Sequence, residues 1–215
     1  MEASVLMCSI RTAESVCAGH PDKLADQIAD QILDDILYDD KAARVAVEVM
    51  AAGRRIIVTG EITTNHRPRI RESVRTALAR AGYSPLGILI YVWTRRQSSD
   101  INAGVTTSLE ARGGDSSAFA LQGAGDQGTV YGYATAETPE RLPLPLVLAH
   151  RICERLDTAQ VEGTICGIKS DGKAQVSVRY DDTGAPAAVE TVVVSVQHEA
   201  GKDLGVLERE VRSRI

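Results

Sequence analysis

Two short polar segments of the sequence combine glycine with charged side chains, a composition suited to binding phosphate. The first is Gly19-His20-Pro21-Asp22-Lys23, at the start of a predicted helix. Its backbone N–H groups and the positive end of the helix dipole favour a phosphate, while His20 and Lys23 could donate to it and Asp22 could hold a divalent cation. Helix capping with a well-placed carboxylate explains the same residues, so both interpretations stay open.

The second segment is Ser170-Asp171-Gly172-Lys173, directly before a predicted strand. As spacing alone, it is typical of a β-turn. A third segment, Gly123-Ala124-Gly125-Asp126-Gln127-Gly128, has the letters of GxGxxG. Because no strand is predicted before it and no helix after it, a dinucleotide-binding turn is disfavoured, and a loop that approaches a ligand or a partner chain remains possible.

Two carboxylates belong to neighbouring predicted strands. Residues 44–51 and 55–64 alternate apolar and polar side chains around a turn near Gly53, which predicts an antiparallel hairpin. Glu48 and Glu61 are expected roughly opposite each other, on the face away from the valines. Like charges directly opposed destabilise a strand pair, so we expect either a metal ion or ammonium group beside them, or a solvated outer face that screens the repulsion.

The elements that must position these residues follow from hydrophobic periodicity. Helices are predicted over 21–37, 68–81, 145–156 and 202–214, and strands over 44–51, 55–64, 87–93, 175–180 and 189–196. Residues 94–121 lack periodicity, and so long a loop in a compact domain is usually functional or disordered. The sum predicts an α+β fold with antiparallel or mixed sheets and helices packed on one face.

Composition narrows the function classes. The 215 residues carry 24 Lys+Arg against 29 Asp+Glu, a net charge of −5, which argues against a protein that grips nucleic acid or an anionic membrane. No apolar run approaches the ~18 to 20 residues of a membrane span, and no signal peptide is recognisable, so we expect a soluble cytoplasmic protein.

The spacing of Cys8, Cys17, Cys153 and Cys166 favours buried thiols over disulfides or zinc, and His150 is predicted to be a hydrogen-bonded packing residue.

Taken together, six segments resemble the S-adenosylmethionine synthetases (methionine adenosyltransferases), in the family's order and over nearly the whole chain. The segments are Thr12-Ala13-Glu14-Ser15-Val16 leading into Gly19-His20-Pro21-Asp22-Lys23, Gly60-Glu61-Ile62-Thr63-Thr64, Gln97-Ser98-Ser99-Asp100-Ile101-Asn102, Gly123-Ala124-Gly125-Asp126-Gln127-Gly128, Tyr131-Gly132-Tyr133-Ala134-Thr135, and Asp171-Gly172-Lys173-Ala174-Gln175-Val176.

This resemblance implies a reaction in which the sulfur of L-methionine attacks C5′ of ATP and the released triphosphate is cleaved to pyrophosphate and phosphate. It also implies roles for individual residues: catalysis by His20 and Lys173, ATP binding by His20, Lys23, Asp171 and Lys173, Mg²⁺ binding by Asp22, a K⁺ site at Glu48, methionine binding by Glu61 and Gln97, a gating loop over 97–121 that includes Asp100, and a glycine-rich wall that includes Asp126.

The resemblance is to an incomplete version of a three-domain fold. Residues 1–18 and 137–215 are predicted to form one domain, and residues 19–136, with the gating loop, a second. The family continues past the position of Ile215 with an Arg/Lys-rich segment, and it has a Trp and a Pro where this chain has 164–170, and a Pro in place of Ser99.

We therefore expect a subunit of a split, heteromeric synthetase whose partner chain supplies the basic segment, with a dimer of heterodimers as the simplest assembly. The alternatives are a catalytically inactive homologue that serves as a structural or regulatory partner of a full-length synthetase, and a self-sufficient homo-oligomer with partial chemistry such as nucleotide binding.

Overall fold

The computed structural model describes residues 9–98, 108–117, 120 and 128–215, and the chain divides into two compact units. The first unit comprises residues 1–24, 79–84 and 132–215, and the second comprises 25–78 and 85–131. The chain thus enters each unit more than once, and each unit is described separately below.

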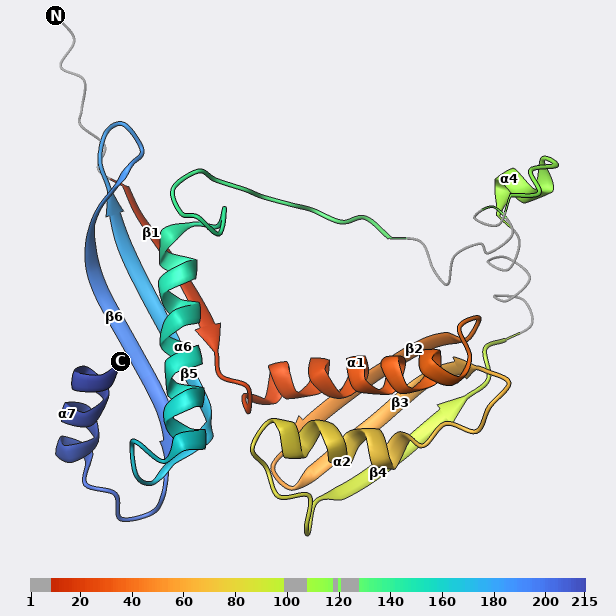
Figure 1. The fold of residues 1–215 in the computed structure, drawn as a ribbon, viewed down its shortest axis with the longest axis horizontal. Coiled ribbons are helices and arrows are strands. Elements are labelled where there is room, and N and C mark those ends of the chain that lie inside the picture. The colour runs from red at the N-terminus through yellow and green to blue at the C-terminus, as the bar shows by residue number, and fades with distance from the viewer. Residues whose placement is uncertain (1–8, 99–107, 118–119, 121–127) are drawn as a thin grey trace, which may run out of the picture. The chain divides into compact units, whose positions relative to one another are not determined.

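The first unit contains a three-stranded antiparallel sheet in the order β1-β5-β6 (Figure 1). Its strands are β1 (Ser9–Val16), β5 (Ile168–Tyr180) and β6 (Pro186–His198), and its helices are α6 (Leu144–Glu162) and α7 (Leu204–Arg214). Helix α6 packs along β5 and β1. Helix α7 joins the same core through Leu207, which clusters with Ile165 and Ile168.

Strand β5 alternates strictly between the two faces of this sheet. Ser170, Ala174 and Val176 are buried on the side covered by α6, while Asp171 and Lys173 point to the other side. The buried positions near the start of the strand are occupied by small residues, which leaves room for a close approach of neighbouring backbone. The strand therefore separates charged groups on one face from a tightly packed core on the other.

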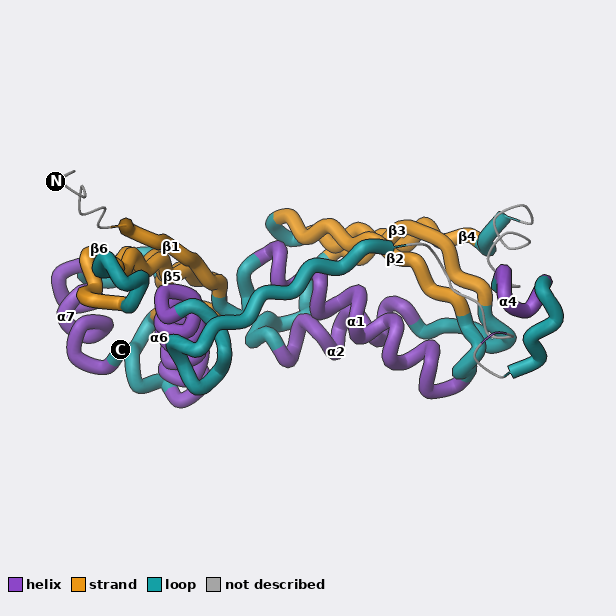
Figure 2. Tube along the Cα trace, turned by 90° about the horizontal axis from the view of Figure 1, so that it is seen from above, coloured by secondary structure: helices purple, strands orange, loops and turns teal. Residues whose placement is uncertain are grey.

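The second unit contains a mixed three-stranded sheet in the order β2-β3-β4. Strands β2 (Arg44–Ala52) and β3 (Arg55–Thr63) are antiparallel and joined at Gly53, whose φ of 56° suits glycine, and β4 (Leu89–Arg95) runs parallel to β3. Helices α1 (Pro21–Asp39) and α2 (Ile70–Arg80) cover one face of the sheet (Figure 2). The buried core of this unit consists of Ile28, Ile32, Ile36, Ile56, Val58, Ile62, Val74 and Leu78.

The other face of this sheet carries exposed apolar side chains. Met50 and Trp93 remain 55% and 65% exposed, and the rings of Tyr91 and Trp93 stack with centroids 6.0 Å apart. Glu48 and Glu61 lie on the same face. Glu48 pairs with Thr59 and Thr59 pairs with Trp93, and paired residues of neighbouring strands point to the same side of a sheet; Glu61, two residues after Thr59, points to that side too. The two carboxylates therefore share this face with exposed apolar side chains.

These elements confirm the predicted α+β class, and every predicted helix and strand is present with ends shifted by several residues at most, except that β5 begins seven residues earlier than predicted. Strand β1 had no counterpart among the predicted strands, because most of its side chains are exposed and its polar sequence lacks apolar alternation. The β-turn interpretation of residues 170–173 is wrong, since they lie inside β5. The prediction missed this part of the strand because its buried residues, Ser170 and Gly172, are small and give no hydrophobic alternation.

A short helix, α4 (Leu109–Arg112), interrupts the region predicted to be irregular. The N-cap Ser108 accepts a hydrogen bond from the Ala111 N–H at its start. No helix in the ranges described above combines the length and apolar character that crossing a membrane requires.

Candidate functional site

The two polar segments singled out in the sequence lie side by side in the first unit. The N–H of Cys17 donates to the carbonyl of Gly172 at 2.9 Å, and the N–H of Gly19 donates to the carbonyl of Ser170 at 3.1 Å. These bonds continue the pairing of β1 with β5 beyond the end of β1. The segment that carries His20 is thereby fixed against the segment that carries Asp171.

This approach requires glycine on both segments. A Cβ on Gly19 would lie 2.5 Å from the Cβ of Ser170, and a Cβ on Gly172 would lie 2.8 Å from the sulfur of Cys17. Real Cβ atoms do not come this close to other heavy atoms, so any side chain at Gly19 would push the two segments apart. The glycines of both motifs therefore have a packing role.

The side chain of His20 is hydrogen-bonded within its own turn. Its Nδ1 accepts a hydrogen bond from the N–H of Asp22 at 3.3 Å, so the neutral ring carries its proton on Nε2. The carboxylate of Asp22 lies 3.8 Å from the same Nδ1 and is 92% exposed. The turn thus combines an Nε2–H donor with an exposed carboxylate, which suits contact with a phosphate and a hydrated cation.

The two lysines of the site are both engaged within the chain. Lys173 pairs with Glu14, with Nζ and Oε1 2.7 Å apart, and Lys23 donates to the carbonyl of Val16. The Lys173–Glu14 pair is partly exposed and so contributes little stability, which makes it exchangeable for an anionic ligand. Lys23 is half-buried and turned back toward the end of β1.

The carboxylates of the second unit are arranged differently from the prediction. Glu61 lies opposite Ala46, and Glu48 lies opposite Thr59, so the two are diagonal neighbours and not directly opposed. A metal ion or an ammonium group was one expectation for these carboxylates; the cation that the structure places beside Glu61 is the chain's own Arg95, whose Nε lies 3.1 Å from Glu61 Oε1. Because the prediction placed the turn only approximately, it misjudged the register by two residues.

Gln97 follows β4 in the same unit. Its amide oxygen is shielded from solvent and has no hydrogen-bond partner among the residues that the structure describes. Asp100 and Asp126 lie outside the described residues, as do residues 99–107, 118–119 and 121 of the predicted gating loop and residues 123–127 of the glycine-rich segment. The residues expected to bind methionine (Glu61 and Gln97) thus belong to the second unit, and those expected to bind ATP belong to the first.

A metal ion would find few protein ligands in the described part of the chain, where no three or more His, Cys, Asp or Glu side chains gather. Asp22 offers one exposed carboxylate. That donor set fits Mg²⁺ bound together with a nucleotide, because Mg²⁺ usually takes one or two carboxylates and completes its shell with phosphates and water. Glu48 likewise offers a single exposed carboxylate to K⁺.

Two residues of the site were not recognised in the sequence. The carboxylate of Asp157 on α6 accepts the N–H of Ala18, and the hydroxyl of Tyr83 donates to the carbonyl of Gly19 at 2.7 Å. Burial raises the pKa of Asp157, and burial together with the charge of Asp171 raises the pKa of Tyr83. The sequence offered one signal for Asp157. It follows Cys153 by one helical turn, so it is expected near the buried face of the helix.

Cys17, Cys153, Cys166 and His150 also belong to the first unit. Cys17 and Cys153 are buried free thiols, as predicted, whereas Cys166 is exposed because it lies in the turn after α6. Hydrogen bonding between the two buried thiols lowers the pKa of Cys153 to about 7 and raises that of Cys17. The ring of His150 hydrogen-bonds to Ser15 at 2.8 Å, which confirms the predicted packing role.

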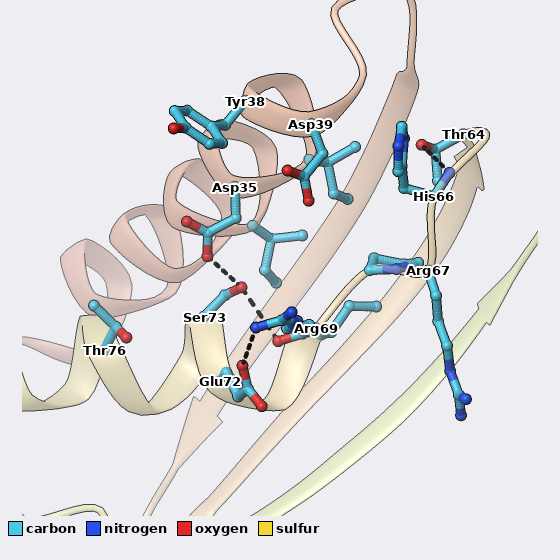
Figure 3. Close-up of a pocket in the computed structure, with 14 residues that line it drawn as sticks. Asp35, Tyr38, Asp39, Thr64, His66, Arg67, Arg69, Glu72, Ser73 and Thr76 are labelled. Carbon is cyan, nitrogen blue, oxygen red and sulfur yellow. Dashed lines mark hydrogen bonds and ion pairs between the residues drawn. The ribbon is translucent and has the colours of Figure 1, made fainter.

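A separate cleft of about 370 Å³ lies in the second unit between α1, α2 and residues 64–69 (Figure 3). Some of the charged and polar side chains that line it pair with one another. Asp35 accepts the hydroxyl of Ser73 at 2.6 Å, and Arg69 pairs with Glu72 at 3.7 Å. None of the site residues predicted from the sequence lines this cleft.

Comparison with known proteins finds relatives for both parts of the chain. Residues 9–99 match the model of the S-adenosylmethionine synthetase N-terminal domain, and residues 121–215 match that of the central domain. The S-adenosylmethionine synthase of Kosmotoga olearia is 46% identical over 211 residues, which are 95% of this chain and 53% of that protein. The S-adenosylmethionine synthase of Corynebacterium urealyticum is 45% identical over 196 residues, which are 87% of this chain and 49% of that protein.

The chain thus spans about half the length of the curated relatives that it matches. The matched regions contain both segments that pair at the site, the histidine turn and the start of β5. The chain belongs to the S-adenosylmethionine synthetase family.

Proposed function

We propose that this chain is one subunit of a methionine adenosyltransferase and supplies its binding groups for the ATP phosphates. The observation that carries the proposal is the pairing of Cys17 and Gly19 with residues 170–172, which sets His20 beside the Asp171–Lys173 segment within one unit. Membership of the family supports the same assignment.

In the proposed reaction the sulfur of methionine attacks C5′ of ATP, the C5′–O bond breaks, and the electron pair leaves with the triphosphate. Water then cleaves the triphosphate to pyrophosphate and phosphate. No protein nucleophile is needed, so the residues act by alignment and by stabilising charge on the leaving group. His20 would donate through Nε2–H, and Lys173 would exchange Glu14 for a phosphate oxygen.

Magnesium would be held by Asp22 together with phosphate oxygens, and it would supply charge neutralisation of the triphosphate. In the second unit the methionine ammonium would replace Arg95 on Glu61, and the amide oxygen of Gln97 would gain a partner. Glu48 would contribute one ligand to K⁺. Residues 97–121 would gate the site.

The charge of the site supports a contribution from further polypeptide. Lys23 already donates to Val16 and Lys173 already pairs with Glu14, so these residues offer little unengaged positive charge to a triphosphate. We propose that a second protein chain supplies the remaining cations, in a hetero-oligomer such as a dimer of heterodimers, in the cytoplasm.

The test is to purify the tagged chain from the cells that make it and to assay the product with ATP, methionine, Mg²⁺ and K⁺. We expect S-adenosylmethionine and phosphate to form, with a co-purifying chain identified by mass spectrometry. His20→Ala and Lys173→Ala should each lower turnover on the order of 10²-fold, the typical effect of one preorganised donor. His66→Ala, which removes an exposed imidazole from the second unit, is the matched control.

Three outcomes would contradict the proposal in different ways. Full turnover by the isolated chain would remove the need for a partner. Activity that is indifferent to His20→Ala, in a preparation containing a full-length synthetase, would show that the chain is a non-catalytic partner of that enzyme. Absence of any S-adenosylmethionine would reject the activity.

A further inference from the structure

Asp157 is a half-buried carboxylate that the proposed chemistry does not use. It lies on α6, and its Oδ1 and Oδ2 are 3.2 Å and 3.1 Å from the backbone nitrogen of Ala18. Lys23, Cys17 and Glu154 are the charged or titratable groups that act on it. A carboxylate in such a position stabilises the fold only if it is well paired, and its partners are the backbone N–H of Ala18 and the side chain of Cys17.

The hydrogen bonds of the turn before α1 explain why this partner matters. The N–H groups of Cys17 and Gly19 point to β5, and the N–H of His20 points back to the carbonyl of Cys17. Between Cys17 and Gly19, the N–H of Ala18 points to α6, where Asp157 accepts it. Removal of the Asp157 carboxylate would therefore take away an acceptor from a backbone N–H in a partly buried place.

A second contact holds the same turn from another segment. The hydroxyl of Tyr83 donates to the carbonyl of Gly19 at 2.7 Å, and the charge of Asp171 acts on that hydroxyl. The turn is therefore bound to β5, to α6 and to residues 79–84. Each contact involves a backbone group immediately before His20, and none involves the His20 side chain.

We infer that Asp157 is a positioning residue, which holds the Ala18–Gly19 turn by its hydrogen bond so that His20 and Asp22 face the phosphates. This inference rests on the proposed function. Donors for a developing charge act only when they are already in place, and a displacement of about 1 Å in a positioning group can cost on the order of 10²-fold in rate. Asp157 acts through the turn and does not touch the nucleotide.

The experiment compares Asp157→Ala, Asp157→Asn and Asp157→Leu with Glu162→Ala, which removes an exposed carboxylate from the same helix. Two quantities are measured on the full chain by NMR: the exchange rate of the Ala18 amide hydrogen, and the dissociation constant of MgATP. Loss of a hydrogen bond to a charged acceptor should speed exchange of the Ala18 amide about tenfold or more in the Ala and Leu variants.

In these two variants MgATP should bind about tenfold more weakly. Asp157→Asn keeps an acceptor oxygen and should stay within about threefold of the wild type in both quantities. Glu162→Ala should change neither. Leu fills the volume of the side chain without an acceptor, so it decides the question if the Ala variant does not fold.

Failure of the inference and failure of the proposed function give different results. If the wild type binds MgATP, His20→Ala weakens binding and Asp157→Leu does not, only the positioning role is overturned. Equal losses in the Asn and Leu variants would also overturn it, since charge and not the hydrogen bond would then be responsible. If the wild type shows no binding that depends on His20, the proposed function fails and the inference fails with it.

Discussion

At the scale of single residues, the first unit depends on one buried hydroxyl. Tyr180, at the end of β5, is fully buried, and its hydroxyl donates to Glu137 at 2.6 Å. The guanidinium of Arg11 lies 4.2 Å from the centre of its ring. Burial and the neighbouring carboxylate raise the pKa of Tyr180 to about 12. The pKa of Glu137 is lowered, because hydrogen bonds from Tyr180 and the Leu144 N–H outweigh the effect of burial.

We predict that Tyr180→Phe lowers the free energy of unfolding by about 1 to 3 kcal/mol at neutral pH, because Glu137 loses a donor. In the wild type the raised pKa means that only the unfolded chain releases this proton between about pH 10 and 12, so stability falls as pH rises through that window. The variant lacks this group, and its deficit should shrink above pH 10.

Urea unfolding at pH 7 and pH 11 measures both effects. Tyr38→Phe, at a side chain that is 88% exposed on α1, is the control and should change neither value. A deficit that stays constant over this pH range would show that the Tyr180 hydroxyl does not titrate as described.

At the scale of elements, the site depends on how closely two segments approach. Residues 17–19 lie against the start of β5 because glycines occupy the contact points. The sequence motifs around Gly19 and Gly172 are usually considered for their charged members. Here the glycines decide whether the charged members can be neighbours at all.

Gly19→Ala should therefore destabilise the first unit by about 1 to 3 kcal/mol, the usual cost of overpacking a rigid contact. The added Cβ would lie 2.7 Å from backbone atoms of Ser170, which cannot turn aside as a flexible side chain could. Thermal unfolding measures the loss, and MgATP binding should weaken in parallel.

Gly132→Ala is the matched control, because nothing lies within 4 Å of the Cβ it would add. Equal stability of the Gly19→Ala and Gly132→Ala proteins would mean that the two segments separate without cost. That result would contradict the close packing on which the candidate site depends.

At the scale of the whole molecule, the candidate residues are divided between the two units. His20, Asp22, Asp171 and Lys173 belong to the first unit, and Glu48, Glu61 and Gln97 belong to the second. One chain therefore carries both sets of groups.

A mixing experiment tests whether the two sets of groups act together within one copy or between two copies. His20→Ala and Glu61→Ala should each lower turnover of the purified assembly on the order of 10²-fold. If each site draws its two units from two copies, mixing the variants in equal amounts and letting subunits exchange should restore about a quarter of the wild-type activity, since half of random dimers are mixed and one of their two sites is intact. No recovery after demonstrated exchange would indicate that each copy supplies both units to its own site.

Much of the candidate site could be predicted from the sequence because it consists of contiguous motifs. The turn that carries His20 and Asp22, the hairpin that carries Glu48 and Glu61, and the α+β class all follow from short-range spacing and periodicity. Such signals report which residues are neighbours along one element. Apart from a hairpin, whose two strands follow each other in the sequence, they contain no information on which element lies beside another.

The tertiary structure alone decided the contacts between elements. It showed that residues 170–173 are a strand and not a turn, that Arg95 is the cation beside Glu61, and that Asp157 and Tyr83 hold the backbone before His20. Each of these contacts joins residues far apart in sequence, and each depends on strand register or on a single backbone hydrogen bond. The sequence thus determined the chemical groups that this protein offers, while their positions were determined by the packing of α6 and β5 against the end of β1, which no local pattern encodes.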